Sequence, residues 1–129
     1  MAALNASRGT NGVGPLGANL DLTAKAQAWA GYLAVNSNNS CTGATLSHSV
    51  LRNGAPVGAT WLGENVGCSI RNGDLNSFVD PLEAAFMGSP GHRANILSTN
   101  FMYAGVGLAL IDLPNGQTLV YEVQEFAAV

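Results

Sequence analysis

Charge is scarce in this chain of 129 residues, because only 10% of them are Asp, Glu, Lys or Arg, against about 25% in an average domain. Five basic residues and a net charge of −3 leave no patch able to neutralise several phosphates, so nucleic acid is excluded as an expected partner. Anionic membrane surfaces are disfavoured for the same reason. The sequence contains no apolar run long enough to span a bilayer and no transmembrane segment is expected.

The N-terminus lacks the basic region and the apolar region of a signal peptide. We therefore expect a mature or excised domain in which Met1 is an added start residue. The length and the hydrophobic content of 47% predict a single globular domain over residues 1–129. We expect this domain to be a monomer.

Cysteine and histidine are also rare, with two of each. A disulfide between Cys41 and Cys68 would close a loop that contains His48 and Glu64, and a loop of that size stabilises a fold by about 3–4 kcal/mol. The alternative is a pair of unrelated buried thiols. The low charge and the abundance of Asn and Ser favour the disulfide and an extracellular, secreted protein.

Apolar periodicity predicts an α+β fold. Segments with helical character lie at 3–9, at 20–35 with Asp21 as the capping residue, at 78–86, and from Pro90 to Leu97 after a Ser89 cap. Two segments, 103–112 and 118–126, are dense in β-forming residues, and Asn115-Gly116 between them is a hairpin turn signal. The segment 61–67 could form a further strand with a glycine bend.

Both histidines lie in short polar motifs, and a glutamate motif lies between them. These motifs are Ser47-His48-Ser49, Gly63-Glu64-Asn65-Val66-Gly67 and Ser89-Pro90-Gly91-His92-Arg93-Ala94-Asn95-Ile96-Leu97. Two imidazoles and a carboxylate are the minimum set for a divalent metal or for acid–base chemistry near neutral pH. Position near a helix N-terminus lowers the pKa of His92 and keeps its imidazole neutral, as a metal ligand requires.

Each of these residues also has a structural interpretation. His48 can be a loop histidine bonded to backbone, His92 can support the helix start, and Glu64 can pair with backbone N–H groups. Asn65 is interpreted as structural. Trp29 and Trp61 are interpreted as packing residues in the core or in a cleft wall. Glu122 and Glu125 are expected to lie on the surface of the sheet.

Taken in order, the motifs resemble the CAP superfamily of cysteine-rich secretory proteins, antigen 5 and pathogenesis-related proteins, in its compact bacterial branch. Further matching features are Leu4-Asn5 with Arg8, Gly105-Val106-Gly107, and the run Tyr121 to Phe126. The resemblance covers nearly the whole chain. It implies an α-β-α sandwich, in which a central antiparallel sheet is covered by helices on both faces.

The resemblance also implies an open cleft lined by His48, Glu64 and His92. In several animal members a second Glu completes a tetrad, and aligned on the aromatic position Phe86 it falls here at Ser89. Glu83 is not an obvious substitute. The sequence therefore leaves three site residues and no assigned fourth member.

Three functions stay open on this sequence. The first is a secreted binding module that holds a divalent metal, a small molecule or a peptide in the cleft, with Zn²⁺ on His48 and His92. The second is a metal-assisted, protease-like hydrolase with Glu64 as base, although Glu64 would then have to act as both ligand and base. The third is a lipid-binding or sterol-binding protein.

Overall fold

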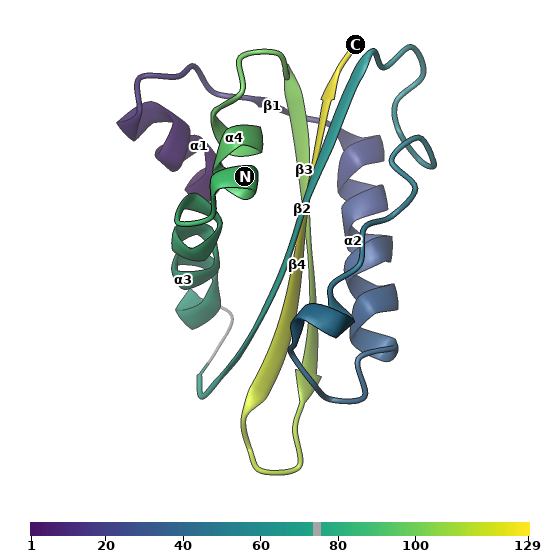
Figure 1. Ribbon diagram of the computed structural model, residues 1–129, viewed down its shortest axis with the longest axis vertical. Coiled ribbons are helices and arrows are strands. Elements are labelled where there is room, and N and C mark those ends of the chain that lie inside the picture. The colour runs from purple at the N-terminus through teal and green to yellow at the C-terminus, as the bar shows by residue number, and fades with distance from the viewer. Residues whose placement is uncertain (74–75) are drawn as a thin grey trace.

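The computed structural model describes residues 1–73 and 76–129, and describes the side chains of helix α3 from residue 81 onward. In chain order its elements are α1 (Ala2–Thr10), β1 (Gly17–Ala18), α2 (Leu20–Val35), the 3₁₀ turn η1 (Gly43–Thr45), β2 (Trp61–Arg71), α3 (Asn76–Met87), α4 (Pro90–Leu97), β3 (Tyr103–Asp112) and β4 (Thr118–Ala128). In Figure 1 the sheet is seen edge on, with α2 on one face and α1, α3 and α4 on the other. The expected α-β-α sandwich is confirmed.

The sheet has the strand order β1-β3-β4-β2. The three long strands are antiparallel, as expected, and β2 extends four residues beyond the predicted segment, to Arg71. The two-residue strand β1 joins β3 in parallel through Gly17 and Tyr103, so the whole sheet is mixed. Gly116 in the β3–β4 hairpin has a φ of +87°, which agrees with its predicted turn position.

Strand β4 lies between two long strands and has helices over both faces, so nearly all of its residues are buried. The assignment of Glu122 and Glu125 to the sheet surface is therefore wrong, since they are only 4% and 2% exposed. Successive side chains of β4 point to the two faces of the sheet in turn, and helices cover both faces, so neither set faces solvent. Glu125 points toward α2, whereas Glu122 points toward the α1 and α3 side.

Helix α2 lies directly on β3 because β3 has glycines at the contact. A Cβ atom on Gly105 would be 2.2 Å from the backbone nitrogen of Thr23, and one on Gly107 would be 2.2 Å from that of Gln27. The helix begins after Asn19, whose side chain accepts a hydrogen bond from the Leu22 amide at 3.0 Å. The capping residue is thus Asn19 and not Asp21.

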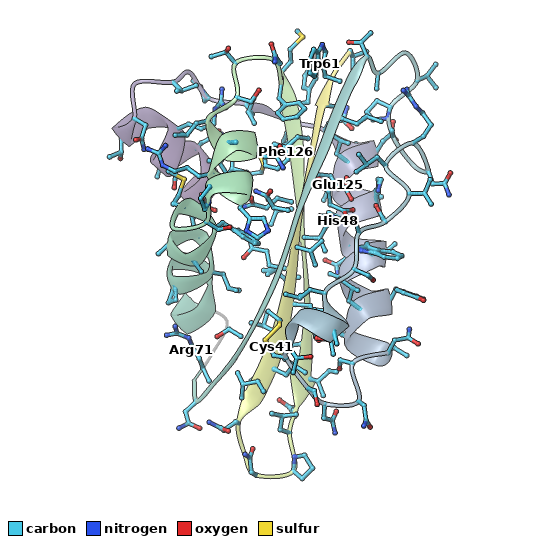
Figure 2. The ribbon with its side chains drawn as sticks, in the orientation of Figure 1. Cys41, His48, Trp61, Arg71, Glu125 and Phe126 are labelled. Atoms are coloured by element: carbon cyan, nitrogen blue, oxygen red, sulfur yellow. A yellow bond between two sulfur atoms is a disulfide. The ribbon has the colours of Figure 1, made fainter. Side chains whose placement is uncertain are left out.

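The predicted disulfide is confirmed between Cys41 and Cys68 (Figure 2). It attaches the loop after α2 to strand β2 and packs against the main core, beside Val66. The segment that follows Cys41 then runs over the α2 side of the sheet to the start of β2 (Figure 1). His48 and Ser49 lie on this segment. No helix formed by the described residues has the length and apolarity needed to cross a membrane.

Candidate functional site

Glu64 is the centre of a hydrogen-bond network between β2, α2 and the loop that carries His48. Its Oε1 accepts a hydrogen bond from His48 Nδ1 at 2.8 Å and one from the Ser49 amide at 2.9 Å. Its Oε2 accepts from the Ser49 hydroxyl and lies 3.7 Å from Lys25 Nζ. The carboxylate is buried, with a side chain only 1% exposed. Both of its oxygens are therefore already engaged.

A second carboxyl group, that of Glu125, belongs to the same network. Lys25 Nζ lies 2.9 Å from Glu125 Oε1 and also donates to the Ser49 hydroxyl. Burial and a hydrogen bond with Glu64 raise the pKa of Glu125 to about 8. Burial acts to raise the pKa of Glu64 as well, but hydrogen bonds from Glu125, Ser49 and His48 outweigh it and hold that pKa below its ordinary value. Near neutral pH, Glu125 is thus the protonated member of the pair.

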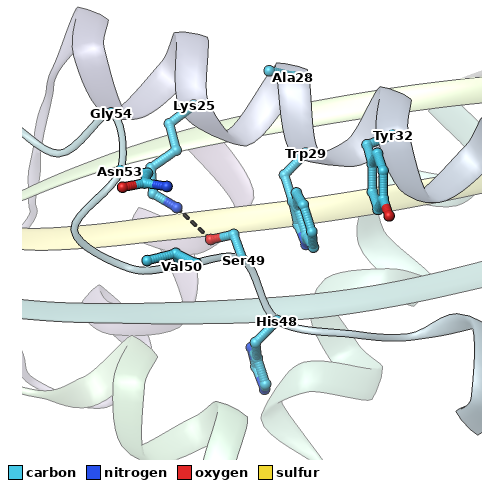
Figure 3. A pocket seen from close by; sticks show the side chains of 9 residues that line it. All are labelled: Lys25, Ala28, Trp29, Tyr32, His48, Ser49, Val50, Asn53 and Gly54. Carbon is cyan, nitrogen blue, oxygen red and sulfur yellow. Dashed lines mark hydrogen bonds between the residues drawn. The ribbon is translucent and has the colours of Figure 1, made fainter.

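His48 is held by this network but remains accessible. Its side chain is 66% exposed, and in Figure 3 it points away from α2, beyond strand β2. A carboxylate that accepts from Nδ1 keeps the proton on that nitrogen, which leaves Nε2 as the free acceptor of a neutral imidazole. This orientation matches the carboxylate–histidine arrangement that supports metal-binding imidazoles.

His92 lies in the first turn of α4, half-buried against Phe86, with ring centroids 4.9 Å apart in an edge-on arrangement. Burial lowers the pKa of His92, and the positive charge of protonated His48 lowers it further. The direction agrees with the expectation from the sequence, although the main cause is burial.

Two amides attach α4 to the sheet and so fix the position of His92. Asn95 Nδ2 donates to Asn65 Oδ1 at 2.9 Å and to the Glu64 carbonyl at 3.3 Å. Asn65 Nδ2 donates to the His92 carbonyl at 3.1 Å and to Gln124 Oε1 at 3.0 Å. The structural interpretation of Asn65 agrees with these contacts.

The other end of α4 is held by Arg8, which is 3% exposed. Its guanidinium donates to the carbonyls of Ile96 at 2.7 Å, Ser98 at 2.9 Å and Gly14 at 2.6 Å. Arg8 therefore connects α1 to the C-terminal end of α4. Its contribution to the site is positional, because it makes no contact with either imidazole in these hydrogen bonds.

Comparison with known proteins identifies the family. The family model described as "CAP: Cysteine-rich secretory protein family" matches residues 1–125. The chain belongs to the CAP family. No curated protein matches the chain significantly.

Two solved structures share the CAP fold with this chain at low sequence identity. An outer surface protein from Borrelia burgdorferi has a TM-score of 0.65 and 16% identity, over 98% of this chain and 86% of that one. The protein MpPR-1i has a TM-score of 0.61 and 19% identity, over 97% of this chain and 81% of that one. At such identities the likeness concerns the fold alone.

In this CAP domain the position aligned with the fourth tetrad member holds Ser89, the residue before the first turn of α4. Glu83 is buried on α3, and its Oε2 accepts a hydrogen bond from Gln124 Nε2. No hydrogen bond or ion pair of the described residues joins Glu83 to His48 or His92. Within that same part of the chain, no three His, Cys, Asp or Glu side chains form a group suited to a metal ion.

Sequence reasoning missed Lys25, which joins Glu64 and Glu125. Lys25 lies on the same stripe of α2 as Leu22, Ala26 and Trp29, all of which contribute to the apolar side of the helix. A lysine within an apolar stripe is the signal that was available, because a buried ammonium requires an acidic partner.

A cavity of about 400 Å³ lies beside the network, on the α2 side of the sheet (Figure 3). One wall is the stacked pair Trp29 and Tyr32, with ring centroids 4.6 Å apart. Figure 3 shows the His48 side chain pointing away from the other side chains that line this cavity. Trp29 thus has its expected role in a cavity wall. The corresponding interpretation of Trp61 is wrong, since that side chain is 57% exposed.

Proposed function

We propose that this CAP domain is an extracellular binding module that holds its ligand between His48 and His92. The ligand classes are a small molecule or peptide with acidic or polar groups and a weakly bound divalent cation. An extracellular location is supported by the Cys41–Cys68 disulfide, because such bonds persist in oxidising compartments. The family description, which refers to secretory proteins, supports the same location.

The observation that carries this proposal is the engagement of Glu64. A general base needs a free oxygen that can reach a water molecule, whereas both Glu64 oxygens accept hydrogen bonds from His48 and Ser49. The low pKa of Glu64 also makes it a weak base. Its arrangement suits the orientation of His48, which supports binding over hydrolysis.

A zinc ion fits this donor set only in part. The free Nε2 of His48 and the neutral imidazole of His92 are two nitrogen donors, and closed structural zinc sites have four protein ligands. Water would have to complete the coordination. We therefore expect a Kd for Zn²⁺ in the micromolar range or weaker, and weaker binding as the pH falls through about 6.5.

Titration calorimetry with ZnCl₂ tests the proposal on the wild type, His48→Ala, His92→Ala and Ser47→Ala. Ser47→Ala is the matched control, because Ser47 is exposed beside His48 and only its backbone carbonyl binds Trp29 Nε1. We expect each histidine variant to lose at least tenfold in affinity and the control to bind as the wild type does. Equal zinc binding by the wild type and by a double variant without His48 and His92 would refute the shared site.

The hydrolase alternative predicts turnover that the binding module does not. Zinc-loaded protein should hydrolyse peptide, ester and phosphoester substrates no faster than the background reaction. Turnover that disappears in Glu64→Gln, a variant that retains the size of the side chain, would replace the binding proposal by the hydrolase.

A second candidate ligand is a small apolar molecule in the cavity beside Trp29 and Tyr32, the class to which the lipid or sterol alternative belongs. The volume of about 400 Å³ and the aromatic wall support it. Because Trp61 is exposed, a Trp61→Phe variant isolates the fluorescence of Trp29. Saturable quenching or a spectral shift with a short-chain aliphatic or aromatic probe is expected, and a strictly linear response would dismiss this candidate.

A further inference from the structure

Two carboxyl groups are buried together on the face of β4 opposite the His48 network. Glu83 comes from α3 and Glu122 from β4, and they are 5% and 4% exposed. Gln124 lies between them, and its Nε2 donates to Glu83 Oε2 at 2.8 Å and to Glu122 Oε1 at 3.4 Å. Each glutamate thus uses one oxygen within the protein.

The other oxygen of each glutamate has no partner within the part of the chain that the structure describes. Glu83 Oε1 and Glu122 Oε2 are buried and make no hydrogen bond among the described residues. A buried polar atom without a partner is rare in native proteins and destabilises the fold, more so when it is charged. Two such atoms on neighbouring carboxyl groups indicate that a donor belongs at this position.

The contrast with the opposite face of the sheet shows what is missing. There, Glu64 and Glu125 share the buried ammonium of Lys25. No lysine or arginine side chain of the described residues forms an ion pair with Glu83 or Glu122. Burial and the charge of Glu83 raise the pKa of Glu122 to about 7, whereas Gln124 and the α-ammonium of residue 1 lower it.

Both glutamates line one cavity of about 230 Å³ between α1, α3 and the sheet. Gln124 lines the cavity beside them, and the other described lining residues are apolar: Met1, Ala2, Ala3, Leu4, Val106 and Leu108. The cavity therefore combines an acidic end with an aliphatic lining. Its volume is sufficient for a short alkyl chain that carries one charged group.

We propose that this cavity is a second binding site, which takes a primary alkylammonium group between Glu83 and Glu122. The ammonium has three N–H donors, enough for the two unpartnered oxygens and one further acceptor. Its alkyl chain would contact the aliphatic walls. An anionic amphiphile is excluded by the two carboxylates, and a hydrated divalent ion requires more oxygen ligands than the apolar walls supply.

Two sources offer this chemistry, a free aliphatic amine and the lysine side chain of a peptide. The corresponding probes are n-butylammonium chloride and Nα-acetyl-lysine-N-methylamide. Binding is measured by the ¹⁵N–¹H shifts of the Gln124 side-chain amide and of the Ala2 and Ala3 backbone amides, at pH 8. Stronger binding of the lysine probe assigns the site to peptides, and stronger binding of butylammonium assigns it to free amines. n-Butanol tests the apolar walls alone, and MgCl₂ tests a metal site.

Glu122→Gln and Glu83→Gln remove one charge each while retaining side-chain size. Asp112→Asn is the matched control, since it removes one exposed charge at the far end of β3. We expect saturable shifts at millimolar concentration in the wild type and control, and binding at least tenfold weaker in each glutamine variant. Both glutamine variants should remain folded, because each relieves the repulsion between two buried carboxyl groups.

The proposal is overturned if neither ammonium probe gives saturable shifts with the wild type. Equal affinity of the wild type and the glutamine variants would overturn it too, as would equal affinity for n-butanol. Saturable shifts with MgCl₂ that compete with butylammonium would replace it by a metal site. Because His48 and His92 take no part in this test, its result is independent of the proposed function.

Discussion

Glu64 and Glu125 are direct partners across β2 and β4, and both carboxyl groups face the single ammonium of Lys25. Two carboxylates that share one buried lysine would repel each other if both were ionised. One proton and one lysine reduce the charge of the group, with Glu125 the protonated member near neutral pH. His48 is attached to this group through Glu64, so its orientation depends on a charge balance set in the interior.

Lys25→Met should destabilise the protein by about 3 kcal/mol, because it leaves Glu64 and Glu125 buried without their cation. The free energy of unfolding from urea denaturation at pH 7 measures the loss. The double variant Lys25→Met with Glu125→Gln should recover at least half of it, since Glu64 retains Ser49 and His48 as donors. A neutral effect of Lys25→Met would mean that the carboxyl pair does not require the lysine.

Glu122→Gln should stabilise the protein at pH 8 by up to about 3 kcal/mol. The pKa of Glu122 is about 7 in the folded protein against 4.5 for the free group, so its contribution to stability is fully present below pH 4.5 and is lost as the pH rises through about 7. Glutamine does not titrate and removes this loss. The free energy of unfolding, measured by urea denaturation, should decrease less between pH 5 and pH 8 for the variant than for the wild type. Glu125 has a pKa of about 8 and titrates in both proteins. Part of the decrease in the free energy of unfolding therefore remains in the variant.

Gly107→Ala should destabilise the protein by about 3 kcal/mol or prevent folding, because the new Cβ would lie 2.2 Å from the backbone of α2. The contact consists of backbone atoms, which cannot rotate away. Gly31→Ala is the matched control, since nothing lies within 4 Å of its Cβ position in α2. The control should stabilise the helix by about 0.5–1 kcal/mol. Thermal unfolding of both variants compares the two glycines, and similar melting temperatures would contradict the close packing of α2 on β3.

Reduction of the Cys41–Cys68 disulfide should lower the melting temperature by about 10 °C. The bond closes a loop with a sequence separation of 27, for which loop closure stabilises the fold by about 3–4 kcal/mol. Scanning calorimetry with and without reductant measures the difference. The double variant Cys41→Ser with Cys68→Ser should melt at the lower temperature in both conditions, and a reductant-sensitive double variant would point to an unrelated effect.

Long periodic segments of this sequence were predictable, whereas a very short strand and the burial of charged residues in a strand covered on both faces were not. Helix α2 has helical spacing over four turns and was predicted with its observed bounds. Strand β1 has two residues, Gly17 and Ala18, which are too few for any period. Its existence depends on pairing with β3, a contact far away in the sequence.

The errors at Glu122 and Glu125 have a common physical cause. Alternation along a strand separates two faces but does not state what covers each face. In β4 both faces are covered, so charged residues that alternate with apolar ones still lie in the interior. The same limit applies to the candidate site, where the sequence placed His48, Glu64 and His92 in motifs but contained no sign that Glu125 completes the network around Glu64.

The amides between α4 and α3 form a chain with a fixed polarity. Each nitrogen points to the oxygen of the next member, from Asn95 to Asn65, from Asn65 to Gln124, and from Gln124 to the carboxyl groups of Glu83 and Glu122. The carboxyl oxygens accept from Gln124 Nε2, so the end of the chain sets the direction of each amide before it. The His92 carbonyl therefore always meets an N–H of Asn65. Two carboxyl groups buried on the α1 and α3 side of the sheet thus determine which way an amide faces beside the candidate site.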